Sequence, residues 1–118
     1  MSVVGEDMAR KRGVCCTLDP GIEPAVAAQA ASLLKVLADP TRLSMLATLR
    51  RSDGPICICD FTATYRLGQP TISHHMAKLR AAGLVQSQKR GVWIYYRMAD
   101  HLPAVVGGVL DAALGLAD

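Results

Sequence analysis

Residues 69–84, with the sequence QPTISHHMAKLRAAGL, decide the fold of this chain. Pro70 suits the first turn of a helix, because proline lacks the backbone N–H that a first turn leaves without a partner. From there, Ile72, Met76 and Leu79 share one helical stripe by the i, i+4, i+7 rule. Polar side chains occupy the other faces. The stretch therefore predicts an amphipathic helix with a hydrogen-bonding outer face.

The residues that follow this helix predict a β-hairpin. Gly83 can end the helix, because glycine readily adopts the left-handed conformation that closes a helical turn. Strands are expected at residues 84–88 and 92–98, and the second reads VWIYYRM, a run of residues that favour pleated surfaces. The turn between them carries Lys89, Arg90 and Gly91. A polar-faced helix followed by a basic hairpin indicates a winged helix-turn-helix.

The rest of the chain predicts four more helices in one domain. They are expected at residues 24–38, 40–51, 57–66 and 102–116. Apolar residues make up 51% of the chain and aromatic residues only 4%, which favours helices over an all-β design. We predict a mainly α fold with a small β-hairpin at residues 24–118, preceded by a flexible arm at residues 1–23.

The first and last predicted helices have more apolar surface than the core of one protomer needs. Helix 24–38 carries three alanines beside its apolar stripe, and helix 102–116 has almost no charged face. A chain of 118 residues buries only about two thirds of its unfolded surface, so a lone domain would be marginally stable. We expect these two helices to form the interface of a homodimer, although burial within one protomer would also account for the first of them.

The basic residues are concentrated where the helix and hairpin are predicted. The formal net charge is only +3, but residues 61–99 contain no Asp or Glu. The same segment contains six basic residues: Arg66, Lys78, Arg80, Lys89, Arg90 and Arg97. Such a surface suits contacts to phosphates, since neutralising a phosphate releases condensed counterions. The simpler interpretation is a solvated basic face. A polar-faced helix beside such a surface indicates double-stranded DNA as the partner.

The outer face of helix 69–82 supplies the candidate base contacts. Its outward positions centre on His74 and include Ser73 and Lys78, with Thr71 at the edge and Gln69 at the N-terminus. These side chains can bond base edges or phosphates. In the hairpin, Lys89, Arg90 and Arg97 are candidates for phosphate contacts. By contrast, His75 projects nearer the buried stripe, and a structural role is favoured for it.

Four cysteines form the second candidate site. No segment is long and apolar enough to span a membrane, and the start of the chain has charges where a signal peptide is apolar. We therefore expect a cytoplasmic protein, in which thiols are more often metal ligands or redox sensors than disulfide partners. Cys57 and Cys59 can converge at the start of a helix, whose N-terminus favours the thiolate, and Cys15 and Cys16 lie on the arm.

Three motifs give the chain a resemblance to a known family. They are LADPTRLSML at residues 37–46, ICICDF at residues 56–61 and QPTISHHMAKLRAAGLV at residues 69–85. The chain resembles the ArsR/SmtB family of metal-sensing bacterial repressors. The resemblance implies a homodimeric winged-helix protein that sits on an operator without metal and leaves it when metal binds. It also implies that Gln69, Ser73 and His74 contact DNA.

The choice of ion stays open at this point. Four thiols without a nearby histidine suit As(III) or Sb(III) with three sulfurs, or Cd, Pb or Zn with up to four. Some arsenite sensors of the family have a further cysteine where this chain has Thr62, so Cys15 or Cys16 must complete the site. The zinc site of other members is missing, because Asp100 and His101 have no histidine partners downstream.

Our working hypothesis is an arsenite-responsive repressor whose arm reaches the third helix, within one protomer or across the dimer. A thiol redox or persulfide sensor on the same frame is an alternative, and so are small buried cysteines with no ligand. An enzyme is not expected, because no cysteine has a sequence-adjacent His and the fold offers no evident cleft.

Overall fold

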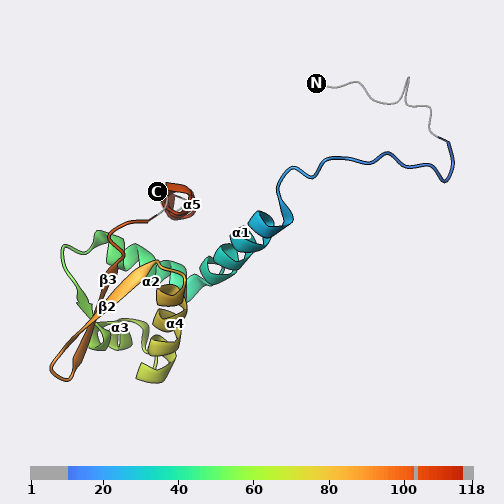
Figure 1. The fold of residues 1–118 in the computed structure, drawn as a ribbon. Helices are drawn as coiled ribbons and strands as arrows, with labels where there is room; N and C mark the ends of the chain where they lie inside the picture. Colours follow the sequence, from blue (N-terminus) through green and yellow to red (C-terminus); the bar gives the residue numbers. More distant parts are fainter. Residues whose placement is uncertain (1–10, 103, 116–118) are drawn as a thin grey trace.

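The computed structural model describes residues 11–102 and 104–115, which form five helices and three short strands. Figure 1 shows the helices arranged around the small sheet, with α1 leading away from the rest of the domain. The elements in chain order are α1 (Pro24–Leu37), α2 (Pro40–Arg51), β1 (Ile56–Cys57), α3 (Ile58–Tyr65), α4 (Gln69–Ala81), β2 (Val85–Arg90), β3 (Trp93–Met98) and α5 (Ala104–Leu114).

The predicted amphipathic helix is confirmed as α4. Ile72, Met76 and Leu79 are each 0% exposed and pack into the core with residues of α2 and α3. The helix ends because Gly83 adopts φ +77, so that its N–H bonds to the Arg80 carbonyl at 2.9 Å and the next N–H bonds to the Leu79 carbonyl at 3.0 Å. These two bonds close the last turn and direct the chain into β2.

The hairpin is also confirmed, but it belongs to a three-stranded antiparallel sheet of order β1-β3-β2. The hairpin pairs run from Val85 opposite Met98 to Arg90 opposite Trp93. The third strand, β1, was not predicted, since residues 57–66 were expected to be one helix. Two residues carry no periodicity, so β1 is recognisable only from its pairing with β3, in which Cys57 lies opposite Tyr95.

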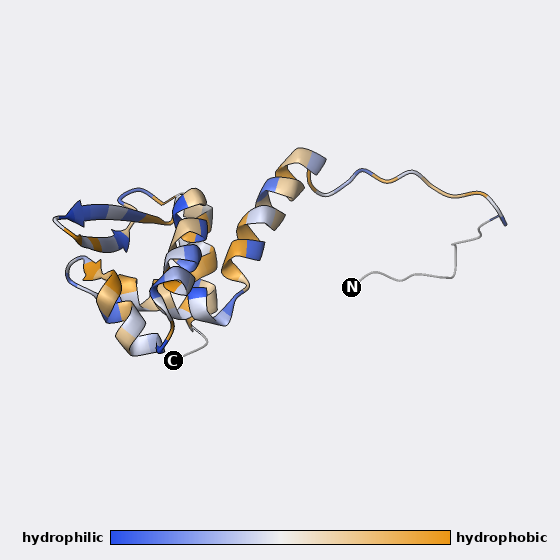
Figure 2. Ribbon diagram, turned by 90° about the horizontal axis from the view of Figure 1, so that it is seen from below, coloured by the Kyte–Doolittle hydropathy of each residue, from blue (hydrophilic) through white to orange (hydrophobic). Residues whose placement is uncertain are grey.

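Helix α1 shares little of its surface with the rest of its own protomer. Among its described side chains only Leu37 is buried, while Val26 is 48% exposed and Leu34 is 50% exposed. Figure 2 shows hydrophobic residues distributed along this projecting helix. Residues 11–23 before it contain no helix or strand, as expected for an arm, and residues 1–10 of the predicted arm lie outside the described part of the chain.

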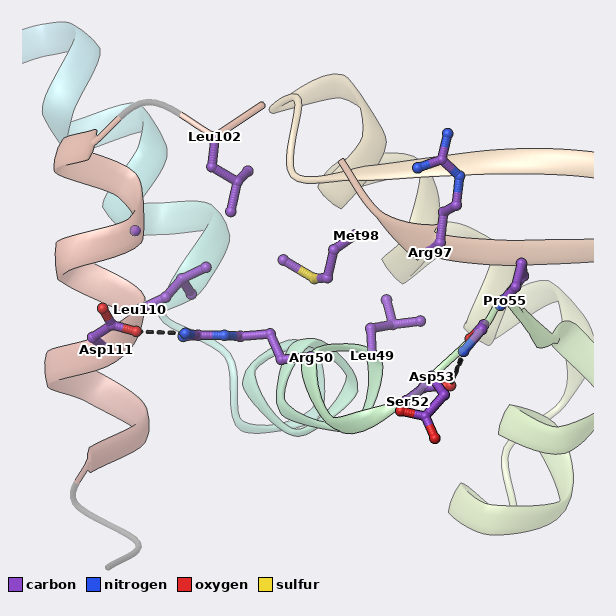
Figure 3. A pocket seen from close by; sticks show the side chains of 12 residues that line it. Leu49, Arg50, Ser52, Asp53, Pro55, Arg97, Met98, Leu102, Leu110 and Asp111 are labelled. Carbon is purple, nitrogen blue, oxygen red and sulfur yellow. Dashed lines mark hydrogen bonds and ion pairs between the residues drawn. The ribbon is translucent and has the colours of Figure 1, made fainter. Parts of the chain in front are cut away.

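Helix α5 packs against α2 and the end of β3. Val106 and Leu110 are buried, and Arg50 of α2 forms an ion pair with Asp111 of α5 at 2.5 Å. Figure 3 shows this pair beside a cleft of about 470 Å³, into which leucine side chains of α2 and α5 point. Within the described ranges, no helix has both the length and the apolar character needed to cross a membrane.

Candidate functional site

The outer face of α4 presents most of the predicted DNA-contacting residues together. Gln69, Thr71, His74 and Lys78 are exposed, and Ser73 is half-buried. Gln69 opens the helix, with Gly68 as a cap that offers no side-chain bond to the free N–H groups of the first turn. These groups and the exposed side chains are all available to a ligand that approaches the N-terminal half of α4.

His75 lies at the edge of this face, where α4 meets α2, and contacts Arg42 of α2. Arg42 Nη1 lies 3.3 Å from His75 Nδ1. Because a guanidinium group can only donate, Nδ1 must accept, and the proton of the neutral ring is then on Nε2. The guanidinium also bonds to the end of α1, with Nε donating to the Val36 carbonyl at 2.7 Å. The half-buried His75 therefore has a partner within the protein, in agreement with the structural role favoured for it.

The basic residues of the hairpin differ in whether a neighbouring side chain already pairs with their charge. Lys89 and Arg90 are exposed near the turn, and the Arg90 guanidinium lies 4.8 Å from the centre of the Tyr95 ring. Arg97 is at the other end of β3, where it forms an ion pair with Asp100 at 2.5 Å. This pairing raises the pKa of Arg97 and lowers the pKa of Asp100. Of the three predicted phosphate contacts, Arg97 alone has a carboxylate as its partner among the described residues.

One basic residue of this surface was not among the sequence-based candidates. Arg80, in the last turn of α4, donates from Nη1 to Ser87 Oγ of β2 at 2.9 Å. It belongs to the acid-free segment, but its place at the C-terminal end of the helix gave no reason to single it out. Only the folded hairpin shows that Arg80 lies between the helix and the strands.

The predicted convergence of Cys57 and Cys59 is present. Cys57 is the last residue of β1 and the N-cap of α3, and its Sγ atom accepts the Cys59 N–H at 3.4 Å. The two Sγ atoms lie 2.9 Å apart. Cys57 is buried, whereas Cys59 is exposed. The pair can therefore bind one ion from the solvent side. Thr62 cannot add a thiolate, and its hydroxyl bonds to the Cys59 carbonyl at 2.8 Å.

The expectation that the helix N-terminus favours the Cys59 thiolate is not confirmed. The pKa of the Cys59 thiol is raised, chiefly because the protonated thiol donates a hydrogen bond to the Cys57 sulfur, which the thiolate cannot do. Desolvation and the neighbouring charges of Cys57 and Asp60 act in the same direction. The Cys59 thiol thus keeps its proton in the absence of an ion, and a bound cation would have to displace it.

Cys15 and Cys16 do not meet the other pair within one protomer. Both are exposed on the arm, and Figure 1 shows the described arm running away from the domain. Within residues 11–102 and 104–115, no three His, Cys, Asp or Glu side chains are grouped as metal ligands usually are. One protomer therefore has a two-sulfur site at the start of α3 and a separate pair of exposed thiols on the arm.

The chain matches a sequence family at the helix-turn-helix. The sequence profile described as "Bacterial regulatory protein, arsR family" matches residues 39–87. The arsenical resistance operon repressor of Escherichia coli is 41% identical over 81 residues, which cover 69% of this chain and 68% of that protein. The arsenic resistance transcriptional regulator ArsR1 of Pseudomonas putida is 40% identical over 84 residues, or 68% and 65% of the two chains.

The fold agrees with that of two solved structures. The AntR antimony-specific transcriptional repressor superimposes with a TM-score of 0.67 at 28% identity, covering 87% of this chain and 95% of that one. NolR from Sinorhizobium fredii superimposes with a TM-score of 0.67 at 27% identity, covering 84% and 96%. The chain therefore belongs to the arsR family of bacterial regulatory proteins, a family of transcriptional repressors and not of enzymes.

Proposed function

We propose that this protein is a cytoplasmic homodimeric repressor that binds operator DNA when free of metal and releases it on binding As(III) or Sb(III). The observation that carries the proposal is the thiol pair, whose Sγ atoms lie 2.9 Å apart at the first turn of α3. Helix α3 is the first helix of the helix-turn-helix, and α4 follows it after three residues. An ion bound there acts on the helix next to the one that reads DNA.

The arm supplies the third sulfur of the proposed site. Cys57 and Cys59 provide two thiolates, and a trivalent arsenic or antimony centre takes three soft ligands. Cys15 and Cys16 are exposed on a segment without helix or strand, so either can move to the pair. In the dimer, the acceptor is the α3 of the same or of the partner subunit. The names of relatives that respond to arsenic and antimony support this choice of ions.

The proposed dimer is formed through α1 and α5. The apolar side chains of α1 are half exposed in the protomer, as at Val26 and Leu34, and burying them requires a second surface. Because each α1 leads directly to an arm, binding of the ion joins the dimer helix to α3. The dimer has one conformation that fits DNA well and one that does not. The ion can favour release only if it binds more tightly to the second conformation than to the first.

A titration of a protein–operator complex with arsenite tests the proposal. We expect arsenite to release the wild-type protein, and Cys57→Ser and Cys59→Ser to bind the operator as the wild type does but to stay bound. Serine is about the size of cysteine, and at position 57 it is also a good N-cap residue. Operator binding that arsenite, antimonite, cadmium, lead and zinc all leave unchanged would show that the protein is not a metal sensor.

The same titration, carried out ion by ion, decides between metalloids and divalent metals. Double substitution of Cys15 and Cys16 by serine removes the arm thiols and leaves the α3 pair intact. We expect this variant to lose the response to arsenite, since two sulfurs cannot fill a three-sulfur centre. Release by cadmium, lead or zinc but not by arsenite would instead assign a four-sulfur divalent site.

A thiol redox sensor is the second candidate, and the same 2.9 Å separation favours it. Peroxide would take two electrons and two protons from Cys57 and Cys59, forming one disulfide and two molecules of water. The expected signature is a loss of two hydrogens by mass spectrometry, together with operator release that a reductant reverses. Release by arsenite under fully reducing conditions would favour the metalloid sensor.

A further inference from the structure

A groove between α4 and the hairpin is not explained by the contacts assigned so far. It has a volume of about 440 Å³ and lies beside the outer face of α4. Its sides combine cationic and hydroxyl groups, and its floor is formed by the strands. The residues that matter are Arg80, Lys89, Ser73, Ser87, Ile94 and Tyr96. The two cations and the two serine hydroxyls around this space are suited to an anion that carries several oxygen acceptors.

Arg80 is held in this groove with most of its donors free. The bond from Nη1 to Ser87 Oγ, at 2.9 Å, uses one of the five N–H groups of the guanidinium. The ion pairs between described residues are Arg50–Asp111 and Arg97–Asp100, and neither includes Arg80. The positive charge of Arg80 is therefore positioned by a neutral hydroxyl and is not compensated by a carboxylate.

The geometry of DNA indicates what passes through this groove. A helix such as α4 enters the major groove, while a wing reaches the neighbouring minor groove or its edge. One sugar-phosphate strand separates two neighbouring grooves. When α4 and the hairpin lie on either side of that strand, the strand must run between them, along the surface that Arg80 and Lys89 line.

We propose that the groove between α4 and the hairpin binds a backbone phosphate of the operator, and that Arg80, held by Ser87, is its principal ligand. The inference rests on the proposed binding of operator DNA. Lys89 is the second cation, and the hydroxyls of Ser73 and Ser87 donate to the remaining phosphate oxygens. The contact carries no base information, so it fixes the register of the protein on DNA and adds affinity to every sequence.

The alternative is that Arg80 only fastens the hairpin to α4. The two roles differ in their dependence on salt, since each phosphate contact contributes about −0.9 to the slope of log K against log salt. A structural bond within the protein contributes nothing to that slope. The experiment measures binding of a duplex selected from random sequence by the wild-type protein, by fluorescence anisotropy over a series of NaCl concentrations.

Arg80→Gln is expected to reduce the salt slope by about one and to weaken binding roughly tenfold at physiological salt, for selected and unselected duplexes alike. Arg80→Lys keeps the charge, so its slope should stay near that of the wild type while affinity falls less. Ser87→Ala should reproduce part of the loss in affinity, and its effect should be smaller when Arg80 is already Gln, because only the direct bond from Ser87 to phosphate is then lost. Arg51→Gln, at an exposed arginine of α2, is the matched control and should change neither quantity.

The outcomes separate this inference from the proposed function. An unchanged salt slope in Arg80→Gln, with or without a lower unfolding temperature, would overturn the phosphate site while leaving metalloid release intact. A reduced slope in a protein that arsenite does not release would support the site and reject the proposed sensor. A wild-type protein that binds no duplex would overturn both.

Discussion

At the scale of single residues, the protonation of Cys59 sets how the proposed sensor depends on pH. The pKa of this thiol is raised, mainly by its hydrogen bond to the Cys57 sulfur, so Cys59 holds its proton near neutral pH. A divalent cation that binds as a thiolate complex must release the thiol proton, and its affinity increases as pH rises. Arsenous acid differs, because As(OH)₃ and three thiols give three As–S bonds and three molecules of water with no net release of protons.

We therefore expect Cd(II) to bind more tightly with increasing pH up to the raised pKa of Cys59, whereas the affinity for arsenite should change little over this range. Alkylation of Cys59 by iodoacetamide should accelerate over the same range of pH. Cys57→Ser removes the sulfur that accepts the hydrogen bond, so alkylation of Cys59 in this variant should begin at lower pH. Isothermal titration and mass spectrometry measure the two quantities. A Cd(II) affinity that does not depend on pH would contradict the raised pKa of Cys59.

Two neighbouring histidines provide a second prediction at this scale. His74 is exposed on the outer face of α4, whereas His75 accepts a hydrogen bond from Arg42. We expect His74→Ala to weaken operator binding without changing the free energy of unfolding. His75→Ala should lower the free energy of unfolding by about 1 kcal/mol, because it leaves a half-buried guanidinium short of an acceptor.

Urea denaturation and anisotropy titrations together check this pair of variants. His75→Asn is the control for the second, because the Asn side-chain oxygen can take the place of Nδ1 as acceptor. It should recover part of the lost stability. Equal effects of the two alanine variants on operator affinity would mean that His75 also contacts DNA.

At the scale of elements, α2 depends on the carboxylate at its start. Asp39 is the N-cap, and its Oδ2 atom accepts the Arg42 N–H at 2.9 Å. That bond lowers the pKa of Asp39, with the charge of Arg42 acting in the same direction. The folded state therefore favours the ionised form. The stabilisation is fully present above the ordinary pKa of an aspartate and is lost as pH falls through the lowered value.

Asp39→Ala is expected to reduce the free energy of unfolding at neutral pH by about 1 kcal/mol, the usual cost of losing an N-cap. The difference from the wild type should become smaller below about pH 4. Asp39→Asn keeps a capping oxygen without the charge, so its stability at neutral pH should be close to that of the wild type. Chemical denaturation at a series of pH values measures these differences. A gap between wild type and Asp39→Ala that persists at low pH would contradict this account.

Elements with their own periodicity or end signals could be predicted from sequence, and those made by distant pairing could not. Ile72, Met76 and Leu79 revealed α4, and Asp39 with Pro40 marked the start of α2 where the structure has it. Strand β1 was missed because its two residues become a strand only beside β3. Most of the candidate DNA surface was predictable because it is the polar face of α4, which the same helical periodicity defines. The bond between Arg80 and Ser87 depends on how the hairpin folds back, and no spacing rule encodes it.

At the scale of the whole molecule, α1 accounts for the proposed dimer. Leu34 is 50% exposed and would be buried by a second copy of the chain, at a gain of roughly 1 kcal/mol, about half the value for burying a leucine fully. Leu34→Glu should therefore shift the protein toward monomers and weaken operator binding, since two linked reading helices bind a palindromic site far better than one.

Sedimentation equilibrium and operator titration check this prediction. Leu18→Glu introduces the same charge on the arm, at a side chain that is 82% exposed, and should leave the dimer intact. A Leu34→Glu variant that sediments as the wild type does would place the interface elsewhere than on this face of α1. The folded state of each variant can be compared by circular dichroism.

The two-residue strand β1 gives the proposed switch a mechanical property. Cys57 ends β1 opposite Tyr95 of the wing and also caps α3, so the same residue is attached to the sheet on one side and to the helix-turn-helix on the other. A displacement of its sulfur therefore acts on both the sheet that carries the wing and the helix-turn-helix. Wing and reading helix should then disengage in a single concerted step, and a half-detached complex should not accumulate during release.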